Sequence, residues 1–365
     1  MVESRMSEPA DPASDPAEAP VPAGAVVPRQ GRAVAEAPGP ELAAFDGAEL
    51  AAARGYADAS RAASTRRAYA SDWRRFSAWC FPRGLETLPA DPRVVAVFLS
   101  AEAALGAAPL TVGRRLAAIG WMHRRAGFLA PQARQGAAAI LEVLAGIRRS
   151  HGVAPVKKHA ADADVLRDIL RGIDGDDLRS VRDRALLAFG MAGAFRRSEL
   201  VALRFSDLEW VKDGLRVSIR RSKTDQEGAG AVIAIPEGRR LRPKALLEAW
   251  IARAGIADGF LFRRLARVPA RAGAEAAEQD VVVTAFPMSD RAVARLVQAR
   301  AGAAGYAGED FAGHSLRAGF LTAAARSGAS VFKMREVSRH KSMQVLADYV
   351  RDAELFRDHA GEGFL

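Results

Sequence analysis

Residues 311–351 read FAGHSLRAGFLTAAARSGASVFKMREVSRHKSMQVLADYVR, and the interpretation of the whole chain starts from this stretch. His314 and Arg317 are three positions apart, which puts both side chains on one face of a helix. A second histidine, His340, follows another short helical pattern, and Tyr349 comes nine residues later. These groups make a candidate phosphate site, because a phenol can attack a group that cations hold in place.

The charge balance of the chain favours a polyanionic partner. Its 365 residues include 53 Lys and Arg against 43 Asp and Glu, a net charge of +10. Arginine supplies most of the excess, and its bidentate guanidinium favours nucleic-acid phosphates over a diffuse attraction to membranes. The alternative explanation of so much arginine is the codon usage of a GC-rich genome.

The cysteine content and the hydropathy bound the class of protein. Cys80 is the single cysteine, which excludes an intramolecular disulfide framework and a cysteine-cluster zinc site. The sequence has no run of about 18 apolar residues, and its acidic, proline-containing N-terminus does not resemble a signal peptide. We therefore expect a cytoplasmic protein with no membrane partner and no metal.

The pattern along the chain divides it into four segments. Residues 1–45 are rich in Ala, Pro, Glu and Asp and are expected to be disordered, because they bury too little apolar surface. Residues 55–150 are predicted to form a helical domain. A basic linker, residues 151–160, leads to a mixed domain over 161–365. The predicted fold class is mainly α with a small antiparallel β-sheet.

Helical patterns in the first domain start at Ser64, a suitable N-cap, and recur over about 91–105, 111–126 and 131–149. Basic residues on these helices and in the linker have two open interpretations, contact with a nucleic-acid backbone or a solvated surface. They are Arg66, Arg67, Arg74, Arg114, Arg115, Lys157 and Lys158.

The second domain is predicted to combine helices with one β-hairpin. Alternating apolar residues over 215–219 and 232–235 predict two strands, and a glycine-rich turn joins them so that the hairpin displays Lys223. A short extended piece is expected over 259–263, and the loop over 268–280 has no assigned function. Helices are expected over about 161–172, 180–194, 196–203, 243–254 and 289–305.

The order and the local contexts of the charged residues resemble the tyrosine recombinase family, which includes phage integrases and Cre-like recombinases. The matching motifs are R-x-S-E-L at 196–200, S-K-T at 222–224, H-x-x-R at 314–317, and a histidine nine residues before a tyrosine. The helical domain also resembles the core-binding domain of the family. The likeness spans roughly residues 55 to 355.

The resemblance implies a site-specific DNA recombinase in which a helical core-binding domain and an α+β catalytic domain clamp double-stranded DNA. It implies a tetramer on two DNA sites, a Holliday junction, no cofactor, and association with the nucleoid when DNA is bound. The implied catalytic residues are Arg196, Lys223, His314, Arg317, His340 and Tyr349. Glu199 would orient Arg196 from one helical turn away, although Arg197 could also face the phosphate.

In the implied mechanism, the two arginines neutralise the phosphodiester while Tyr349 attacks it and forms a 3′-phosphotyrosyl link. Lys223 would protonate the leaving 5′ oxygen. His314 would accept the proton of the tyrosine, and His340 would donate a hydrogen bond to the phosphate.

Two other functions remain open from the sequence. A type IB topoisomerase uses nearly the same residues, and a DNA-binding regulator could keep the motif without the activity. The chain also departs from the family at Arg339, where many members have glycine. Its tail after the tyrosine, residues 350–365, is short.

Overall fold

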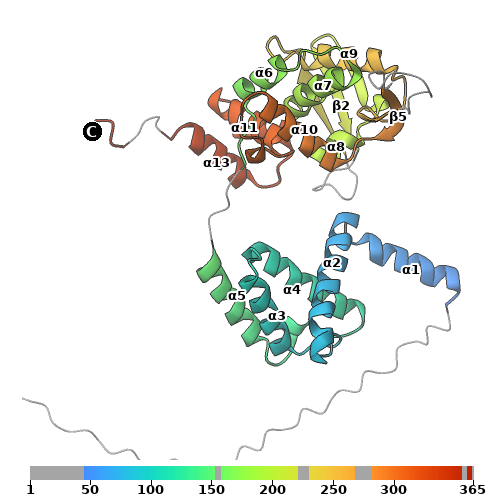
Figure 1. The fold of residues 1–365 in the computed structure, drawn as a ribbon, viewed down its shortest axis with the longest axis vertical. Helices are drawn as coiled ribbons and strands as arrows, with labels where there is room; N and C mark the ends of the chain where they lie inside the picture. The colour runs from blue at the N-terminus through green and yellow to red at the C-terminus, as the bar shows by residue number, and fades with distance from the viewer. Residues whose placement is uncertain (1–44, 153–157, 221–229, 268–280, 356–359, 364–365) are drawn as a thin grey trace, which may run out of the picture. The chain divides into compact units, whose positions relative to one another are not determined.

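The computed structural model of the chain describes residues 45–152, 158–220, 230–267, 281–355 and 360–363. These residues are mainly helical and carry two small antiparallel sheets (Figure 1), so the predicted fold class is confirmed. No described helix is long and apolar enough to cross a membrane. The predicted tail up to residue 44, together with Lys157 and Lys223, lies outside the described residues. The predicted domain boundaries stay predictions.

Helix α1, Gly47–Ala59, is an element that the sequence analysis did not predict. A capping box starts it: the Asp46 carboxylate accepts from the Glu49 N–H at 2.7 Å, and the Glu49 carboxylate accepts from the Asp46 N–H at 3.0 Å. None of its residues is buried. The capping box, rather than a hydrophobic core, therefore stabilises this helix.

The first predicted domain has its own apolar core. Its helices are α2 (Ala63–Cys80), α3 (Pro92–Ala104), α4 (Pro109–Arg125) and α5 (Ala138–His151). Phe76, Phe98 and Ile119 are fully buried between them, and the two phenylalanine rings meet edge to face with 5.0 Å between centroids.

Three predicted helix starts in this domain were wrong. Helix α4 begins at Pro109 rather than near residue 111. Helix α2 begins at Ala63, one residue before the predicted cap Ser64. The last helix begins at Ala138 rather than near residue 131. Pro131–Ala133 instead forms a separate 3-10 turn, and Gly136 then takes a left-handed φ of 89°, which ends any continuous helix through this segment.

The second domain is built around α7 (Leu178–Ala192), which is buried along most of its length. Helices α9 and α11 pack on it from different sides (Figure 1). The Phe189 ring of α7 stacks on Phe195 at 5.3 Å between centroids. The other helices are α6 (Ala163–Arg171), α8 (Arg197–Ala202), α9 (Pro243–Ala254), α10 (Asp290–Ala303), α11 (Ser315–Arg326), α12 (Val331–Ser338) and α13 (Met343–Ala353).

The predicted hairpin is present as β2 (Gly214–Ile219) and β3 (Ala231–Pro236), with Leu215 opposite Ile235 and Val217 opposite Ile233. Strand β1 (Leu208–Val211) adds a third, unpredicted strand at the edge of this sheet. The tip of the hairpin, including Lys223, lies outside the described residues.

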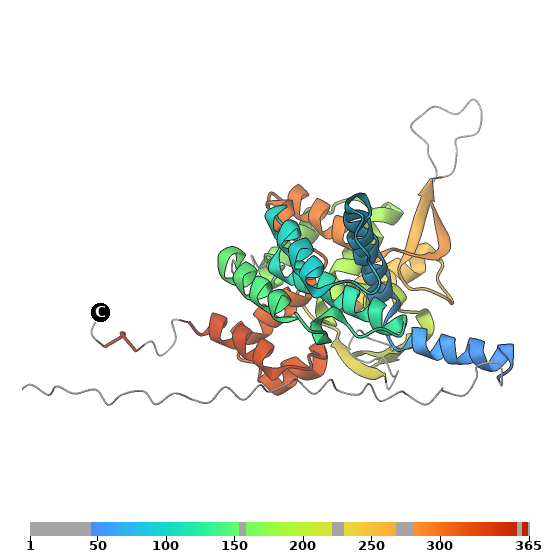
Figure 2. The ribbon, with the colours of Figure 1, turned by 90° about the horizontal axis from the view of Figure 1, so that it is seen from below.

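A second, two-stranded sheet was also not predicted. It pairs β4 (Arg263–Arg267) with β5 (Val281–Pro287) and stands apart from the first sheet (Figure 2). The extended piece predicted at 259–263 forms only an isolated bridge, between Arg204 and Phe260, before β4 begins. The strands of this sheet are far apart in sequence, so no tight-turn signal identified them.

The chain enters the second domain across helix α11, and a glycine makes the crossing possible. The Ala161 N–H donates to the Ser315 carbonyl at 3.0 Å. A Cβ on Gly319 would lie 1.8 Å from the Ala161 carbonyl oxygen. Glycine is therefore required at position 319 by the close backbone approach rather than by its dihedral angles.

We expect Gly319→Ala to lower the free energy of unfolding by about 1–3 kcal/mol, because the added methyl group collides with backbone. The matched control is Gly302→Ala in α10, where a Cβ would meet nothing within 4 Å. That change should raise stability by up to about 1 kcal/mol through helix propensity alone. Urea unfolding of both variants tests this, and equal effects would contradict the crossing.

Candidate active site

Arg196 lies at the N-terminus of α8, where Glu199 holds it at two points. Its backbone N–H donates to Glu199 Oε2 at 2.9 Å, and its Nη1 donates to Glu199 Oε1 at 2.6 Å. The Glu199 residue is 3% exposed. Burial alone would raise the pKa of this carboxyl, but Arg339 and Arg196 outweigh burial and hold the pKa below its usual value. Glu199 is therefore an ionised anchor for Arg196.

Arg197 takes a different path from its neighbour. A Cβ on Gly313 would lie 1.9 Å from Arg197 Cδ, so this side chain runs over the backbone just before His314. The contacts with Glu199 thus belong to Arg196, as the R-x-S-E register implied, while Arg197 lies beside the histidine.

Arg317, near the start of α11, is a buried cation at 1% exposure. Its Nη1 donates to the Ala194 carbonyl at 2.7 Å, and its Nη2 lies 3.1 Å from His340 Nδ1. Among the described residues, no carboxylate forms an ion pair with it, and its Nε has no hydrogen-bond partner. Burial and the neighbouring cations Arg196 and Arg339 lower the pKa of Arg317 to about 9, so it stays charged at neutral pH. A buried, unpaired cation of this kind is a site for an anion.

His340 follows the left-handed end of α12 and is held by its neighbours. Its Nδ1 lies 2.9 Å from Ser338 Oγ as well as 3.1 Å from Arg317 Nη2. Burial, Arg317 and Arg196 lower the pKa of His340 to about 4, so the ring is neutral at physiological pH. Arg317 Nη2 also lies 3.4 Å from Nε2. Because a guanidinium only donates, we assign Nδ1, the ring nitrogen nearer to it and also in contact with Ser338, as the acceptor and Nε2 as the protonated nitrogen. The ring is therefore a neutral imidazole held by Arg317 and Ser338.

His314 and Tyr349 line the same pocket, which has a volume of about 550 Å³. Tyr349 is half-buried on α13 and packs on a small core with Leu346. Burial raises the pKa of the Tyr349 phenol, while Arg317 acts in the opposite direction. Although His314 is exposed, desolvation by its immediate surroundings and the charges of Arg317 and Arg196 lower its pKa, so its imidazole is neutral at neutral pH. A protonated phenol and a proton acceptor therefore share one cavity.

Five of the six predicted catalytic side chains lie on segments that meet here, and Lys223 lies outside the described residues. The segments are the α7–α8 junction, the start of α11, the α12–α13 turn and α13. Arg196 Nη2 donates to the Arg339 carbonyl at 3.4 Å, and Arg317 Nη1 donates to the Ala194 carbonyl. These two bonds join the halves of the site across more than a hundred residues of sequence.

Two residues at this site were missed by the sequence analysis. Ser338 is fully buried against His340. Arg339 donates to Glu199 Oε2 at 2.8 Å and is buried beside it. The signal for Arg339 was that many family members have glycine at this position, whereas nothing in the sequence marked Ser338.

The basic residues of the first domain fall into two groups. Arg114 donates to both oxygens of buried Asp72, at 2.8 and 3.0 Å, and Arg115 pairs with buried Glu102. Arg67 and Arg74 are exposed. The predicted DNA contacts therefore include residues that also satisfy buried carboxylates of their own domain.

Two further residues predicted to contact DNA, Arg66 and Lys158, have partners within the protein. Arg66 lies 3.8 Å from the Asp58 carboxylate. Lys158 donates to the Glu309 carbonyl at 2.7 Å, so the described end of the linker is fastened to the second domain.

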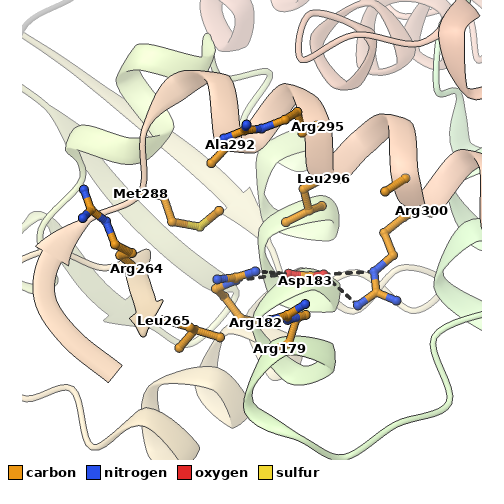
Figure 3. Close-up of a pocket in the computed structure, with 11 residues that line it drawn as sticks. Arg179, Arg182, Asp183, Arg264, Leu265, Met288, Ala292, Arg295, Leu296 and Arg300 are labelled. Carbon is orange, nitrogen blue, oxygen red and sulfur yellow. Dashed lines mark hydrogen bonds and ion pairs between the residues drawn. The ribbon is translucent and has the colours of Figure 1, made fainter. Parts of the chain in front are cut away.

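A second pocket, of about 520 Å³, is lined by arginines from α7, β4 and α10 (Figure 3). Arg182 and Arg300 both bind Asp183, whose two oxygens accept from them at 2.7 and 2.8 Å (Figure 3). Three further arginines line the pocket and are exposed, and within the described ranges none of them forms an ion pair. They are Arg179, Arg264 and Arg295. The pocket thus has a strong excess of positive charge.

Within the part of the chain that the structure describes, no group of His, Cys, Asp and Glu side chains has the arrangement of a metal site. In the candidate active site, the positive charge comes from Arg196, Arg317 and Arg339.

Comparison with known proteins gives consistent matches. Residues 161–355 match the model of the phage integrase family. The chain is 34% identical over 305 residues to an integrase/recombinase xerD homolog of Selenomonas ruminantium, which covers 83% of this chain and 86% of the relative.

Two solved structures share the fold. XerH site-specific recombinase, in a post-cleavage complex with palindromic difH substrate, superposes with a TM-score of 0.52 at 15% identity, over 73% of this chain and 70% of that one. A lambda integrase dimer bound to a COC′ core site superposes with a TM-score of 0.50 at 18% identity, over 85% of this chain and 76% of that one.

The depressed pKa of His340 predicts a pH dependence of stability. Between the ordinary histidine pKa of about 6.5 and the folded value of about 4, the unfolded state binds a proton that the folded state does not. The free energy of unfolding should therefore fall as the pH is lowered through this window, by up to about 1.4 kcal/mol per pH unit for this one proton.

Urea unfolding of the wild type and of His340→Gln, at several pH values in the window, measures this effect. In this window the free energy of unfolding of the variant should change less steeply with pH, by up to the contribution of one proton. Above about pH 7 the two proteins should show nearly the same slope. Parallel curves for the two proteins would show that His340 titrates normally in the folded state.

Proposed function

This chain belongs to the phage integrase family and is a site-specific DNA recombinase of the tyrosine type, and from that premise we propose how its site cleaves and rejoins DNA. Arg196 and Arg317 bind the scissile phosphate of double-stranded DNA, and Tyr349 attacks it. The observation that carries this proposal is the buried guanidinium of Arg317, which has no carboxylate partner among the described residues. Burial raises the pKa of Tyr349, and the charge of Arg317 partly opposes that rise, so the two groups interact electrostatically.

The two arginines supply the electrostatic part of the mechanism. A phosphodiester carries one negative charge, and a five-coordinate phosphorus carries more on its equatorial oxygens. Two guanidinium groups fixed before the substrate arrives stabilise that extra charge without reorganisation. Arg317 is fixed by Ala194 and His340, and Arg196 by Glu199.

Proton transfer completes the step. Tyr349 Oη forms a bond to phosphorus while its proton passes to neutral His314, and the bond from phosphorus to the 5′ oxygen breaks. Lys223 gives a proton to the leaving oxygen, which yields a free 5′ hydroxyl and a 3′-phosphotyrosyl link. His340 donates from Nε2 to a phosphate oxygen. A 5′ hydroxyl of another strand reverses the step, so no cofactor is needed.

The proposed assembly is a tetramer on two DNA sites that passes through a Holliday junction. Two cleavages joined by strand exchange require at least two active sites on each partner duplex. The family match and the recombinase relative do not favour a type IB topoisomerase or an inactive regulator. We place the protein in the cytoplasm, on the nucleoid when it is bound to DNA.

The arginine pocket supports DNA as the partner of the second domain. Arg179, Arg264 and Arg295 come from three elements, and their like charges repel one another unless an anion lies between or beside them. Residues 182 and 192 lie about 15 Å apart along α7, given a rise of about 1.5 Å per residue. A duplex that reaches the active site at one end of α7 would present other phosphates to the pocket at the opposite end.

The nucleophile is tested by replacing Tyr349 with phenylalanine. Tyr349→Phe should bind DNA as the wild type does but form no covalent adduct on a nicked substrate that traps the cleaved strand. Tyr306→Phe is the matched control, because Tyr306 lies in the same domain and donates to Asp168 instead. Denaturing electrophoresis detects the adduct, and an adduct formed by the Tyr349 variant would refute the assignment.

The contribution of the arginine pocket is tested by the salt dependence of binding. If Arg179 and Arg295 each contact a phosphate, replacing both with alanine should reduce the slope of log K against log salt by about 1.8. The control is Arg253→Ala, an exposed arginine of α9 outside this pocket. Filter binding or fluorescence anisotropy at four salt concentrations gives the slopes. If the double variant and the Arg253→Ala control have the same slope, the pocket does not contact DNA.

A further inference from the structure

Arg339 has an unusual backbone conformation for its residue type. It ends α12 with φ 58° and ψ 38°, in the left-handed region that glycine enters freely and arginine enters at a cost. Ala194, whose carbonyl accepts from Arg317, has φ 45°. Strained conformations of this kind persist where surrounding contacts over-determine them, and they gather at functional sites.

The contacts of the Arg339 side chain compensate for this cost. Its Nη2 donates to Glu199 Oε2 at 2.8 Å and lies 3.3 Å from the Ala194 carbonyl, and its Nη1 donates to the Gly193 carbonyl at 3.2 Å. The guanidinium carbon lies 5.5 Å from the centroid of the Phe195 ring. The side chain therefore ties the end of α12 to the α7–α8 junction.

The charge of Arg339 matters to Arg196. Glu199 Oε1 accepts from the guanidinium of Arg196, and Oε2 accepts from the guanidinium of Arg339 as well as from the Arg196 backbone N–H. A carboxylate paired with Arg196 alone would cancel much of the positive potential that Arg196 offers a phosphate. With Arg339 present, the three groups together keep one positive charge, and Arg317 adds a second.

Arg339 does not itself offer a free face to the substrate. Its side chain is 9% exposed, and both terminal nitrogens donate to protein oxygens. Arg317 and Arg339 also share the Ala194 carbonyl, at 2.7 and 3.3 Å. Its effect on the phosphate must therefore pass through Glu199, Arg196 and the Ala194 backbone.

We propose that Arg339 is a positioning residue for cleavage, which offsets the charge of Glu199 and fixes the backbone that holds Arg196 and Arg317. The inference rests on the proposed function, because the reaction that it tunes is the attack on the phosphate. In this chain the arginine that stands where many family members have glycine therefore helps to position the site.

The main variant is Arg339→Gly, which removes the guanidinium and relieves the backbone. We expect single-turnover cleavage of a strand-trapping substrate to fall about tenfold or more, with DNA affinity within about twofold of the wild type. Millimolar guanidinium should restore part of the rate in this variant and not raise that of the wild type. The matched control is Arg335→Ala, which removes an exposed charge from the same helix.

A pair of variants separates the effect of the Arg339 charge from the effect of its packing. Arg339→Lys keeps a charge in the same backbone and should cleave faster than Arg339→Gln, which keeps only the bulk. This pair still decides the question if the glycine variant fails to fold.

The proposal is overturned if Arg339→Gly cleaves at the wild-type rate, or if the Lys and Gln variants cleave equally. The failure of the proposed function would look different, because the wild-type protein itself would then form no covalent adduct. A wild type that forms the adduct together with an unaffected Arg339→Gly variant rejects only the role of Arg339.

Discussion

The interaction on which the rest of the site depends is the burial of the Arg317 guanidinium without a carboxylate partner among the described residues. Removing a cation from water costs free energy that an ion pair would normally offset. Here a carbonyl and a neutral imidazole satisfy some donors while the charge stays unbalanced. In the proposed mechanism the phosphate of the substrate supplies the missing counter-charge, so the same interaction serves both binding and catalysis.

Much of this arrangement could be predicted from the sequence because the chemistry sits in short motifs. The H-x-x-R pair lies within one helical turn, and the R-x-S-E register does indeed give Arg196, rather than Arg197, the contacts with Glu199. Period-two alternation also identified β2 and β3, whose residues pair through a nearby turn. Where a pattern and its partner are close in sequence, local physics is enough.

The remainder depends on contacts that no local pattern carries. Strands β4 and β5 pair across a long connection, and α1 is held by a capping box without a buried face. The buried role of Arg339 requires knowing that α12 ends beside Glu199, 140 residues away. A departure from the family could be seen in the sequence, but only the fold shows which carboxylate it meets.

The crossing of the chain over α11 has a mechanical consequence. The His159 N–H donates to the Asp310 carbonyl at 2.8 Å, and Ala161 bonds to Ser315, two residues before Arg317. The end of the linker is thus hydrogen-bonded to the helix that carries the buried arginine, and Gly319 permits the close approach of the two backbones. A force transmitted through the linker would therefore act first on residues 309–315, the segment that leads directly into the helix carrying Arg317.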